Sequence, residues 1–401
     1  MNKPAELPRM RITTGTPPMG SGPIPASLYT DAAQFERERE GLFRGVWLEL
    51  AREELLPSPG DYLVVPLEIL NTEVILVRGR DGTVRAFHNV CTHRGNRVTR
   101  DCAGNTRNFV CGYHGWTFDT EGNLKSLPGE AYFPDAKREQ LGLQALACDI
   151  WDGFIYVNSD PQPAKSLRAY LGTLADDMEG YPFSTCQHIA RYDATVNVNW
   201  KAFTDAFREG YHVAMVHGQS IPDSMNSPAN PQGMPNSCRF HGPHFAMSTW
   251  GNPAHKPTPS EALAWQYGMT FTPGEQLPWR GINPSGDDVW WFDMNMTFPN
   301  FWVALGPGWY FTYNFWPIAV DRTRWTMNIY QMKAADIAQR IAQEHTKCML
   351  RDLLYEDLST LESTQRGMAS GVIQALQISD ELEISIRHQH WAVEQALEGK
   401  L

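Results

Sequence analysis

Two patterns of apolar and polar residues alternate along the chain. Between residues 48 and 158, short apolar runs rich in β-branched and aromatic residues are separated by turns containing Gly, Asn and Asp, which predicts a small all-β domain. Helical periodicity marks residues 31–46, about 201–216, 334–367 and 380–396, and strand-like runs rich in Trp, Phe, Tyr and Met return at 289–331. This order predicts an α+β fold with the all-β domain inserted early in a larger domain.

The remaining segments have weaker patterns. Residues 1–30 are rich in Pro, Gly and Thr, which favours an extended arm, and ARYDATVNVNW at 190–200 is typical of a strand. Residues 219–286 hold many Pro, Gly, Asn and Ser residues, so we expect long loops with short elements there. The predicted domains are an arm and helix at 1–47 that belong to the larger domain, the all-β domain at 48–158, and the rest of the larger domain at 159–401.

Length and charge narrow the class of protein. The 401 residues suggest two or three domains, and 42% hydrophobic with 20% charged residues is ordinary for a globular chain. A net charge of −11 argues against nucleic acid or an anionic membrane as the main partner. No stretch approaches the roughly 20 apolar residues of a membrane span, and the N-terminus lacks the apolar core of a secretory signal. We therefore expect a cytoplasmic protein.

Two of the seven cysteines stand at metal-ligand spacing from histidines. An odd number of cysteines scattered over a long chain is no disulfide framework. The sequence reads Cys91-x-His93, then seventeen residues, then Cys111-x-x-His114. Each loop offers one thiolate and one imidazole, which suits a two-iron cluster with both thiolates on one iron and both imidazoles on the other.

A structural zinc site is the alternative for these four residues. Zinc patterns normally group Cys with Cys and His with His, whereas each loop here mixes the two. Both loops also continue into glycine, at Gly95 and Gly115, and a tight glycine-containing loop can aim backbone N–H groups at cluster sulfurs. Cys102 lies between the loops and fits neither ligand pattern.

A second candidate site lies in NWKAFTDAFREGYHVAMVHG, residues 199–218. His212 and His217 are five residues apart, which is about 140° around a regular helix. They converge on one metal only if the helix is distorted or ends there, and their spacing alone leaves a purely structural role open. Glu209 and Asp205 precede His212 on the same helical face.

Asp357 is the candidate third ligand. It falls within a stripe of leucines at helical spacing (Leu350, Leu353, Leu354, Leu358 and Leu361). A lone carboxylate on an apolar face is costly unless it is paired or binds a metal. Glu356 and Asp352 lie farther from the centre of the stripe and are expected to be solvated. Two histidines and one carboxylate are the ligand set of non-haem iron oxygenases.

These segments resemble one family. NVCTHRGN and CGYHGWTFDTEGNL are similar to the Rieske signature of the non-haem iron ring-hydroxylating oxygenases, in their alpha (oxygenase) subunit, and NWK followed by YHxxxxH is similar to their catalytic domain. The resemblance covers about residues 28–396. It implies a helix-grip catalytic domain, an antiparallel sheet covered by helices, and a Rieske [2Fe–2S] cluster and Fe(II) as cofactors. The implied cluster ligands are Cys91, His93, Cys111 and His114, and the implied iron ligands are His212, His217 and Asp357.

Two positions depart from the family pattern. Where the family usually has Asp, hydrogen-bonded to the first iron-binding histidine and to a neighbouring subunit's cluster histidine, this chain has Glu209, which we expect to act as a catalytic residue. The family's nearby Asn is Ala206 here. Relatives that act on quaternary amines also use Glu at the first position.

The resemblance implies O₂-dependent hydroxylation or dihydroxylation of an apolar, in the first instance aromatic, substrate. A monooxygenase or demethylase of quaternary ammonium compounds is the alternative, and a non-catalytic Rieske electron-transfer protein is a third reading. The chain lacks a G-x-G-x-x-G fingerprint that opens a helix and a ferredoxin-type cysteine run. Electrons from NAD(P)H must therefore come through a separate reductase, with or without a ferredoxin. A head-to-tail homotrimer, with or without a beta subunit, is also implied.

The aromatic sheet offers candidates for a substrate pocket. We expect most of its side chains to lie in the hydrophobic core and some of them to line a substrate pocket. The candidates are Trp290, Phe292, Met294, Met296, Phe298 and Trp302.

Overall fold

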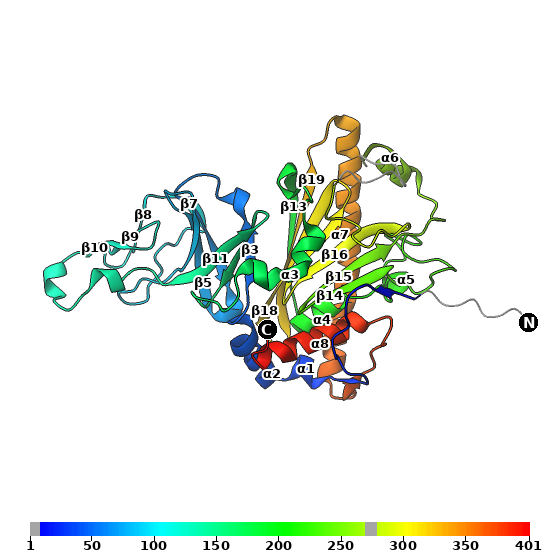
Figure 1. Ribbon diagram of the computed structural model, residues 1–401, viewed down its shortest axis with the longest axis horizontal. Coiled ribbons are helices and arrows are strands. Elements are labelled where there is room, and N and C mark those ends of the chain that lie inside the picture. The colour runs from blue at the N-terminus through cyan, green and yellow to red at the C-terminus, as the bar shows by residue number, and fades with distance from the viewer. Residues whose placement is uncertain (1–8, 269–278) are drawn as a thin grey trace, which may run out of the picture. The chain divides into compact units, whose positions relative to one another are not determined.

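The computed structural model describes residues 9–268 and 279–401, and the chain divides into two compact units. One unit combines Met1–Glu38 with Leu171–Leu401, and the other is Arg39–Tyr170. Figure 1 shows the strands of the second unit in blue to cyan and the larger sheet of the first in green to yellow. The predicted fold class, an all-β domain inserted in an α+β domain, is confirmed.

The inserted unit is built from two antiparallel sheets. The seven-stranded sheet has the order β3-β12-β11-β6-β5-β4-β7 and the three-stranded sheet the order β10-β9-β8. Buried side chains of both sheets, among them Ile75, Phe109 and Phe118, share one core. The strands are β3 (Leu48–Arg52), β4 (Asp61–Leu67), β5 (Thr72–Arg78), β6 (Val84–His88), β7 (Ala103–Asn105), β8 (Asn108–Val110), β9 (Thr117–Asp119), β10 (Leu124–Ser126), β11 (Ala145–Trp151) and β12 (Phe154–Asn158).

The inserted unit extends beyond the strands at both ends. It runs from Arg39 to Tyr170, compared with the sequence-derived range of 48–158. A π-helical turn at Arg39–Phe43 buries Phe43 completely. Trp47 donates its indole N–H to the carbonyl of Lys165. The bond between Trp47 and Lys165 joins the segments that flank the strands on either side.

The larger unit is organised around an eight-stranded sheet. Its order is β1-β14-β15-β16-β17-β18-β19-β13, and only the β1–β14 pair is parallel. β18 is buried along most of its length, as expected for a central strand covered on both faces. The strands are β1 (Arg11–Ile12), β13 (Cys186–Val196), β14 (Ser237–His241), β15 (His244–Trp250), β16 (Trp290–Thr297), β17 (Phe301–Gly306), β18 (Trp309–Ala319) and β19 (Arg322–Met332), and a separate pair joins β2 (Ile24–Pro25) to β20 (Ala375–Leu376).

The region 219–286 contains more sheet than its composition suggests. β14 and β15 form a hairpin within the large sheet, whereas long loops with short elements were expected. The turn glycine Gly242 has φ 63°, and the strand residues include His241, His244 and Ser248, which are buried in polar contacts. Because these strands are polar, they do not show the apolar runs from which strands are usually predicted.

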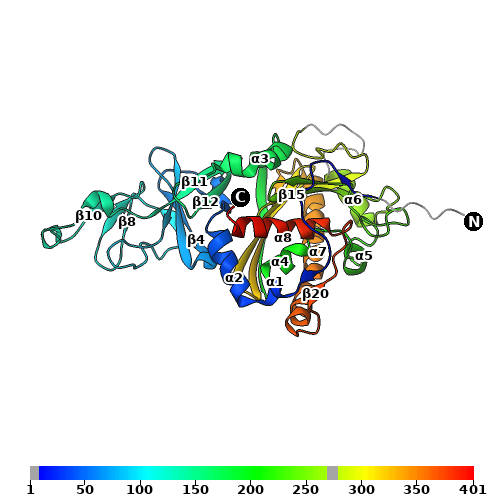
Figure 2. The same ribbon diagram turned by 60° about the horizontal axis from the view of Figure 1, so that its bottom comes forward.

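Helices pack on this sheet (Figures 1 and 2). α4 packs on β18 and β19, and α7 contacts both α4 and β13. The helices are α1 (Ser27–Thr30), α2 (Ala32–Glu38), α4 (Trp200–Asp205), α5 (Val213–Val216), α6 (Pro259–Gly268), α7 (Ile337–Ala369) and α8 (Ile384–Leu397), and α3 (Leu167–Met178) contains the division between the units. No helix in the described ranges is long and apolar enough to cross a membrane.

α4 is fixed at its start by a buried polar cluster. The side chain of Asn199 caps the helix by accepting a hydrogen bond from the amide of Lys201, at 3.0 Å. Lys201 in turn forms a fully buried ion pair with Glu38 of α2, with Nζ and Oε1 2.6 Å apart, and Trp200 donates to the same carboxylate. Removing one partner of such a pair typically costs about 3–5 kcal/mol of folding stability. Both partners are therefore needed to hold the start of α4 in place.

Candidate metal centres

The two loops of the inserted unit have the same backbone scheme. In the first, the amide of Gly95 donates to the carbonyl of Cys91, and the amide of Cys91 donates to the carbonyl of Asn96. In the second, Gly115 and Cys111 make the matching bonds, with Trp116 as the last acceptor. Gly95 and Gly115 have φ 75° and 73°, a left-handed conformation that glycine adopts at little cost.

This scheme sorts the four side chains into a thiol pair and an imidazole pair. The Cys91 and Cys111 side chains are buried and hydrogen-bond to each other. The ring centroids of His93 and His114 are 4.5 Å apart, in a T-shaped arrangement. Trp116 stacks on His93 with ring centroids 4.8 Å apart. Two cysteines beside each other and two histidines beside each other match a cluster with a different ligand pair on each iron.

Backbone amides surround the sulfurs. The N–H groups of His93 and Arg94 face the Cys91 thiol, and those of Tyr113 and His114 face the Cys111 thiol. Burial raises the pKa of Cys91 to about 11. Burial also opposes ionisation of Cys111, but the amide of Tyr113 and the side chain of Asn96 outweigh it and lower the pKa of that thiol. Donors aimed at the sulfurs stabilise thiolates and tune a cluster that they hold.

The geometry discriminates between one metal ion and two. Zinc bonds of about 2.0–2.3 Å bring all four ligand atoms within about 4 Å of one another. Within residues 9–268 and 279–401, the group of His, Cys, Asp and Glu that has three or more ligand atoms within 4.8 Å is His212, His217 and Asp357. The two cysteines and two histidines form no such group in this part of the chain, which disfavours a single zinc ion for them.

The second centre lies at a break between two helices. A continuous helix over about 201–216 was predicted, and this is wrong: α4 ends at Asp205 and α5 begins at Val213. Gly210 lies so close to Gly233 that a Cβ atom on it would overlap the carbonyl oxygen of Gly233. The Glu209 carboxylate accepts the amide hydrogen of His212 at 3.1 Å. Both contacts favour a turn at the place where a helix would continue.

The break brings the two histidines together. His212 precedes the single turn of α5 and His217 follows it, and their ring centroids are 5.2 Å apart. Asp357 of α7 lies between them: its Oδ1 is 3.5 Å from His212 Nε2 and 3.0 Å from His217 Nε2. Asp357 is only 6% exposed and belongs to the buried stripe that also contains Leu350, Leu354 and Leu361. Three ligand atoms therefore converge in a mostly buried place.

Each histidine is oriented by a second carboxylate. Glu209 Oε1 is 2.7 Å from His212 Nδ1, and Glu356 Oε2 is 3.0 Å from His217 Nδ1. Ser220 donates to the same Glu356 oxygen at 2.6 Å. The expectation that Glu356 is merely solvated is therefore wrong, because its side chain is 20% exposed and turns toward His217. Asp352 does match that expectation, since its side chain is 54% exposed and paired with Arg351.

The charges at this centre are strongly coupled. Burial opposes a positive charge on His212, but the carboxylates of Asp357 and Glu209 outweigh it and raise the pKa of His212 to about 10. Burial also opposes ionisation of Asp357, and here hydrogen bonds to both histidines hold the pKa of the carboxyl below its usual value. A metal cation bound to these atoms must displace protons, so its affinity depends on pH.

Asp205 and Ala206 lie outside this triad. Asp205 accepts hydrogen bonds from Tyr29 Oη and Gln389 Nε2, both at 2.7 Å. Loss of solvent contact raises the pKa of Asp205 to about 7. Asp205 therefore belongs to a polar network between α1, α4 and α8. Ala206 ends α4 as its C-terminal cap and offers no polar side chain.

An apolar cluster packs around α5. Its buried members are Val213, Ile221 and Met225, and Trp291, Phe292, Met349 and Leu353 pack against them. Of the six residues proposed from sequence for a pocket, only Phe292 belongs to it, whereas Met294, Met296, Phe298 and Trp302 are buried in the sheet core. Trp291 was missed, although it stands next to two residues that were considered. No sequence pattern pointed to Met349, which comes from α7.

Comparisons with known proteins agree with this arrangement. The family model described as "Rieske [2Fe-2S] domain" matches residues 46–137, and the one described as "Ring hydroxylating alpha subunit (catalytic domain)" matches residues 183–399. The large oxygenase component of a naphthalene 1,2-dioxygenase system from Pseudomonas aeruginosa is 36% identical over 205 residues, which are 48% of this chain and 44% of that protein. The carnitine monooxygenase oxygenase subunit of Escherichia coli (strain K12) is 32% identical over 202 residues, which are 50% of this chain and 53% of that protein.

The chain thus aligns with about half the length of these curated relatives. The fold match is more extensive. The crystal structure of a quaternary ammonium Rieske monooxygenase in complex with L-carnitine has a TM-score of 0.73 and 22% identity, with 94% of this chain and 96% of that chain covered. At this identity the match concerns the fold.

Proposed function

The chain belongs to the ring-hydroxylating oxygenase alpha subunits, which include a Rieske [2Fe–2S] domain, and we propose that it is the oxygenase component of a multicomponent system. In this proposal it uses O₂ and electrons from NAD(P)H to hydroxylate a small organic substrate. The observation that carries the proposal is the pair of separate ligand groups, one of sulfur and nitrogen atoms and one of nitrogen and oxygen atoms. The first suits one-electron storage, and the second suits an oxygen-activating iron.

Cys91, Cys111, His93 and His114 would hold the [2Fe–2S] cluster. Two neutral imidazoles in place of two thiolates make such a cluster less negative and raise its reduction potential above that of an all-cysteine ferredoxin. The backbone amides that face both sulfurs act in the same direction, because they stabilise the electron-rich state. His93 and His114 are the more exposed pair of ligands, which leaves their side of the loops open for electron exit.

His212, His217 and Asp357 would hold Fe(II) and leave coordination positions for O₂ and substrate. The bound iron supplies the redox chemistry for O₂, which the amino acids of this triad lack. The chain prepares the site through Glu209 and Glu356: each accepts the Nδ1 hydrogen of one histidine, so both Nε2 lone pairs point toward the centre. Val213, the neighbour of His212, belongs to the apolar cluster around α5.

An aromatic substrate is our first candidate. Trp291 and Phe292, which pack in a T-shaped pair 5.3 Å apart, and the side chains of Met349 and Leu353 offer apolar contacts beside α5. Similarity to a naphthalene 1,2-dioxygenase component supports this class. A quaternary ammonium substrate is the second candidate, because Glu209 departs from the family's usual Asp and aromatic rings can bind alkylammonium groups. Similarity to a carnitine monooxygenase subunit supports it.

We also propose the partners that the chemistry requires. The chain needs an electron supply from a separate reductase, directly or through a ferredoxin. A closed head-to-tail homotrimer would bring the cluster of one subunit to the iron of its neighbour. Glu209, hydrogen-bonded to His212, would then bridge to His114 of that neighbour.

Two measurements test this function. Iron analysis of the reconstituted protein should give three irons per chain, and two would favour a non-catalytic Rieske protein. The second is O₂ uptake coupled to product formation, supported by a surrogate reductase and measured with naphthalene and with carnitine. Product from one class alone assigns the substrate class. Three irons without product from a wider panel of either class would contradict the oxygenase assignment.

A further inference from the structure

The cluster loops form a basic region in an acidic chain. The formal net charge of the chain is −11, yet residues 94–110 contain Arg94, Arg97, Arg100 and Arg107 against Asp101 alone. All five side chains are exposed. Arg97 pairs with Glu73, and Arg94 lies over the ring of Tyr113 at 5.4 Å. Within the part of the chain that the structure describes, neither Arg100 nor Arg107 makes an ion pair, so both charges are available to a partner.

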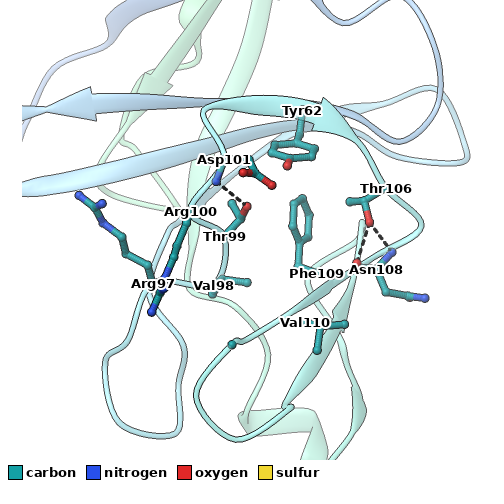
Figure 3. Close-up of a pocket in the computed structure, with 11 residues that line it drawn as sticks. Tyr62, Arg97, Val98, Thr99, Arg100, Asp101, Thr106, Asn108, Phe109 and Val110 are labelled. Atoms are coloured by element: carbon teal, nitrogen blue, oxygen red, sulfur yellow. Dashed lines mark hydrogen bonds between the residues drawn. The ribbon is translucent and has the colours of Figure 1, made fainter.

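A cavity of about 490 Å³ opens among these residues. Figure 3 shows Arg97 and Arg100 on one side of it and the rings of Tyr62 and Phe109 facing each other inside. The two rings meet edge to face, with centroids 5.2 Å apart. Val110, which also lines the cavity, is 56% exposed. Both rings are buried beneath the cavity. Its lining is mixed, with Val110 as an exposed apolar residue and Arg97, Arg100 and Asp101 as charged residues, and protein-docking surfaces combine apolar and charged contacts in this way.

The cavity adjoins the thiolate side of the loops. Gly112, next to Cys111, lines it, and so do Arg97 and Val98. The carbonyl oxygen of Arg97 is 3.9 Å from Cys111 Sγ. The lining of the cavity therefore includes one residue that contacts this sulfur and one that follows its cysteine in the chain. Neither His93 nor His114 lines the cavity, so a partner seated here leaves the imidazole pair free.

From these observations we infer that the cavity and its arginine rim (Tyr62, Arg97, Arg100, Phe109 and Val110) dock an acidic, small iron–sulfur electron-donor protein. This inference rests on the proposed function, because it assumes that the loops hold the cluster. The donor passes one electron to the cluster from the cysteine side, and the donor's own centre is oxidised as the cluster is reduced. The imidazole side remains available for onward transfer to the iron.

The charge pattern favours an acidic donor. A basic rim attracts an acidic partner over distances up to the Debye length, about 8–10 Å at moderate salt, and raises the association rate. Transient electron-transfer complexes bury small interfaces, so one cavity with a mixed apolar, polar and charged lining is a sufficient contact area. A second copy of this chain is the competing occupant, because most of the chain's negative charge lies outside residues 39–170.

Binding of an acidic plant-type [2Fe–2S] ferredoxin to the full, cluster-loaded chain tests the inference. The dissociation constant is measured by calorimetry at low salt and again at about 0.5 M salt, where electrostatic attraction is screened. The variants are R97E/R100E and the single variant R100E, which leaves the Arg97–Glu73 pair intact. The matched control is R80E, whose exposed side chain lies at the turn between β5 and β6, at the opposite end of β6 from the Cys91 loop.

We expect R97E/R100E to weaken ferredoxin binding by about tenfold or more at low salt, R100E by less, and R80E by less than twofold, with the differences shrinking at high salt. Wild-type affinity in R97E/R100E, or no ferredoxin binding by the wild type, would overturn the inference. If light scattering shows that R97E/R100E has a different oligomeric state from the wild type, the inference is also overturned, because the surface would then make contacts between copies of this chain. Cluster spectra of dithionite-reduced protein report on folding. If the wild type binds ferredoxin through these arginines but oxidises no substrate, the proposed function fails while the docking surface stands.

Discussion

Replacing Glu356 tests how the two histidines of the candidate iron centre are held. In Glu356→Ala, His217 loses the carboxylate 3.0 Å from its Nδ1, and Ser220 loses its acceptor. His217 is 3% exposed, so water cannot easily replace the lost partner. A hydrogen bond to a charged group contributes about 1.5–3 kcal/mol, and removal of such an orienting partner typically lowers metal affinity about 10- to 100-fold. We therefore expect iron affinity to fall by about 1.4–2.7 kcal/mol.

The assay is competition for Fe(II) between the apoprotein and a coloured chelator, with the cluster absorbance as an internal check on folding. Glu356→Gln should recover much of the affinity, because its amide oxygen can still accept the Nδ1 hydrogen. Asp352→Ala is the matched control, since Asp352 lies on the same helix but is exposed and paired with Arg351. If Glu356→Ala holds iron as tightly as Asp352→Ala, the carboxylate does not orient His217 and the reasoning is wrong.

Four other predictions concern the remaining titratable and metal-binding groups. Asp357→Ala should remove the mononuclear iron and activity while leaving the cluster spectrum intact, and iron content at the wild-type level would contradict the assignment of Asp357 as the third ligand. Glu209→Gln should keep both centres but slow reoxidation of a prereduced cluster by O₂ and substrate, with Glu209→Asp retaining part of the rate; stopped-flow absorbance measures this, and an unchanged rate in Glu209→Gln would exclude the bridge. The pKa of Asp205 is raised to about 7 from an ordinary 3.8, so the protonated side chain favours the folded state; this stabilisation is complete below pH 3.8 and lost as the pH rises through 7. Relative to Asp205→Asn, the wild type should lose up to about 4 kcal/mol of unfolding free energy across that window. If the denaturation midpoints of the two proteins differ by the same amount at pH 5 and pH 8, taken as test conditions, the prediction is contradicted. Alanine at any single cluster ligand should abolish the visible and electron-paramagnetic signals of the cluster, and a zinc-only preparation from iron-replete, anaerobic cells would contradict the assignment; these ligands are Cys91, His93, Cys111 and His114.

The sequence predicted those features that depend on short-range spacing. Strands β16 to β19 follow from apolar runs between turn residues, and together they span the predicted range 289–331 to within one residue at each end. The spacing of Cys91 and His93, and of Cys111 and His114, is a local pattern within each of two tight loops. Asp357 was identified because a carboxylate within a leucine stripe conflicts with burial.

The features that were missed depend on contacts distant in sequence. The helix break before His212 arises where Gly210 meets Gly233, and helical periodicity carries no information about that crossing. Glu356 was judged by its distance from the leucine stripe on α7, but its partner His217 lies on another element. The β14–β15 hairpin was hidden because buried histidines, an arginine and serines occupy positions that are apolar in most strands.

The crossing of Gly210 and Gly233 also limits how this protein can be redesigned. A side chain at Gly233 would place its Cβ 2.7 Å from the carbonyl oxygen of Gly210, and one at Gly210 would be still more crowded. Any mutagenesis library that diversifies the loop after His217 to alter substrate choice therefore acts on the backbone that spaces the two histidines. Diversity placed at Trp291, Phe292 or Met349 instead changes the apolar wall without touching this crossing. Laboratory evolution should consequently accumulate tolerated changes at the wall and retain both glycines.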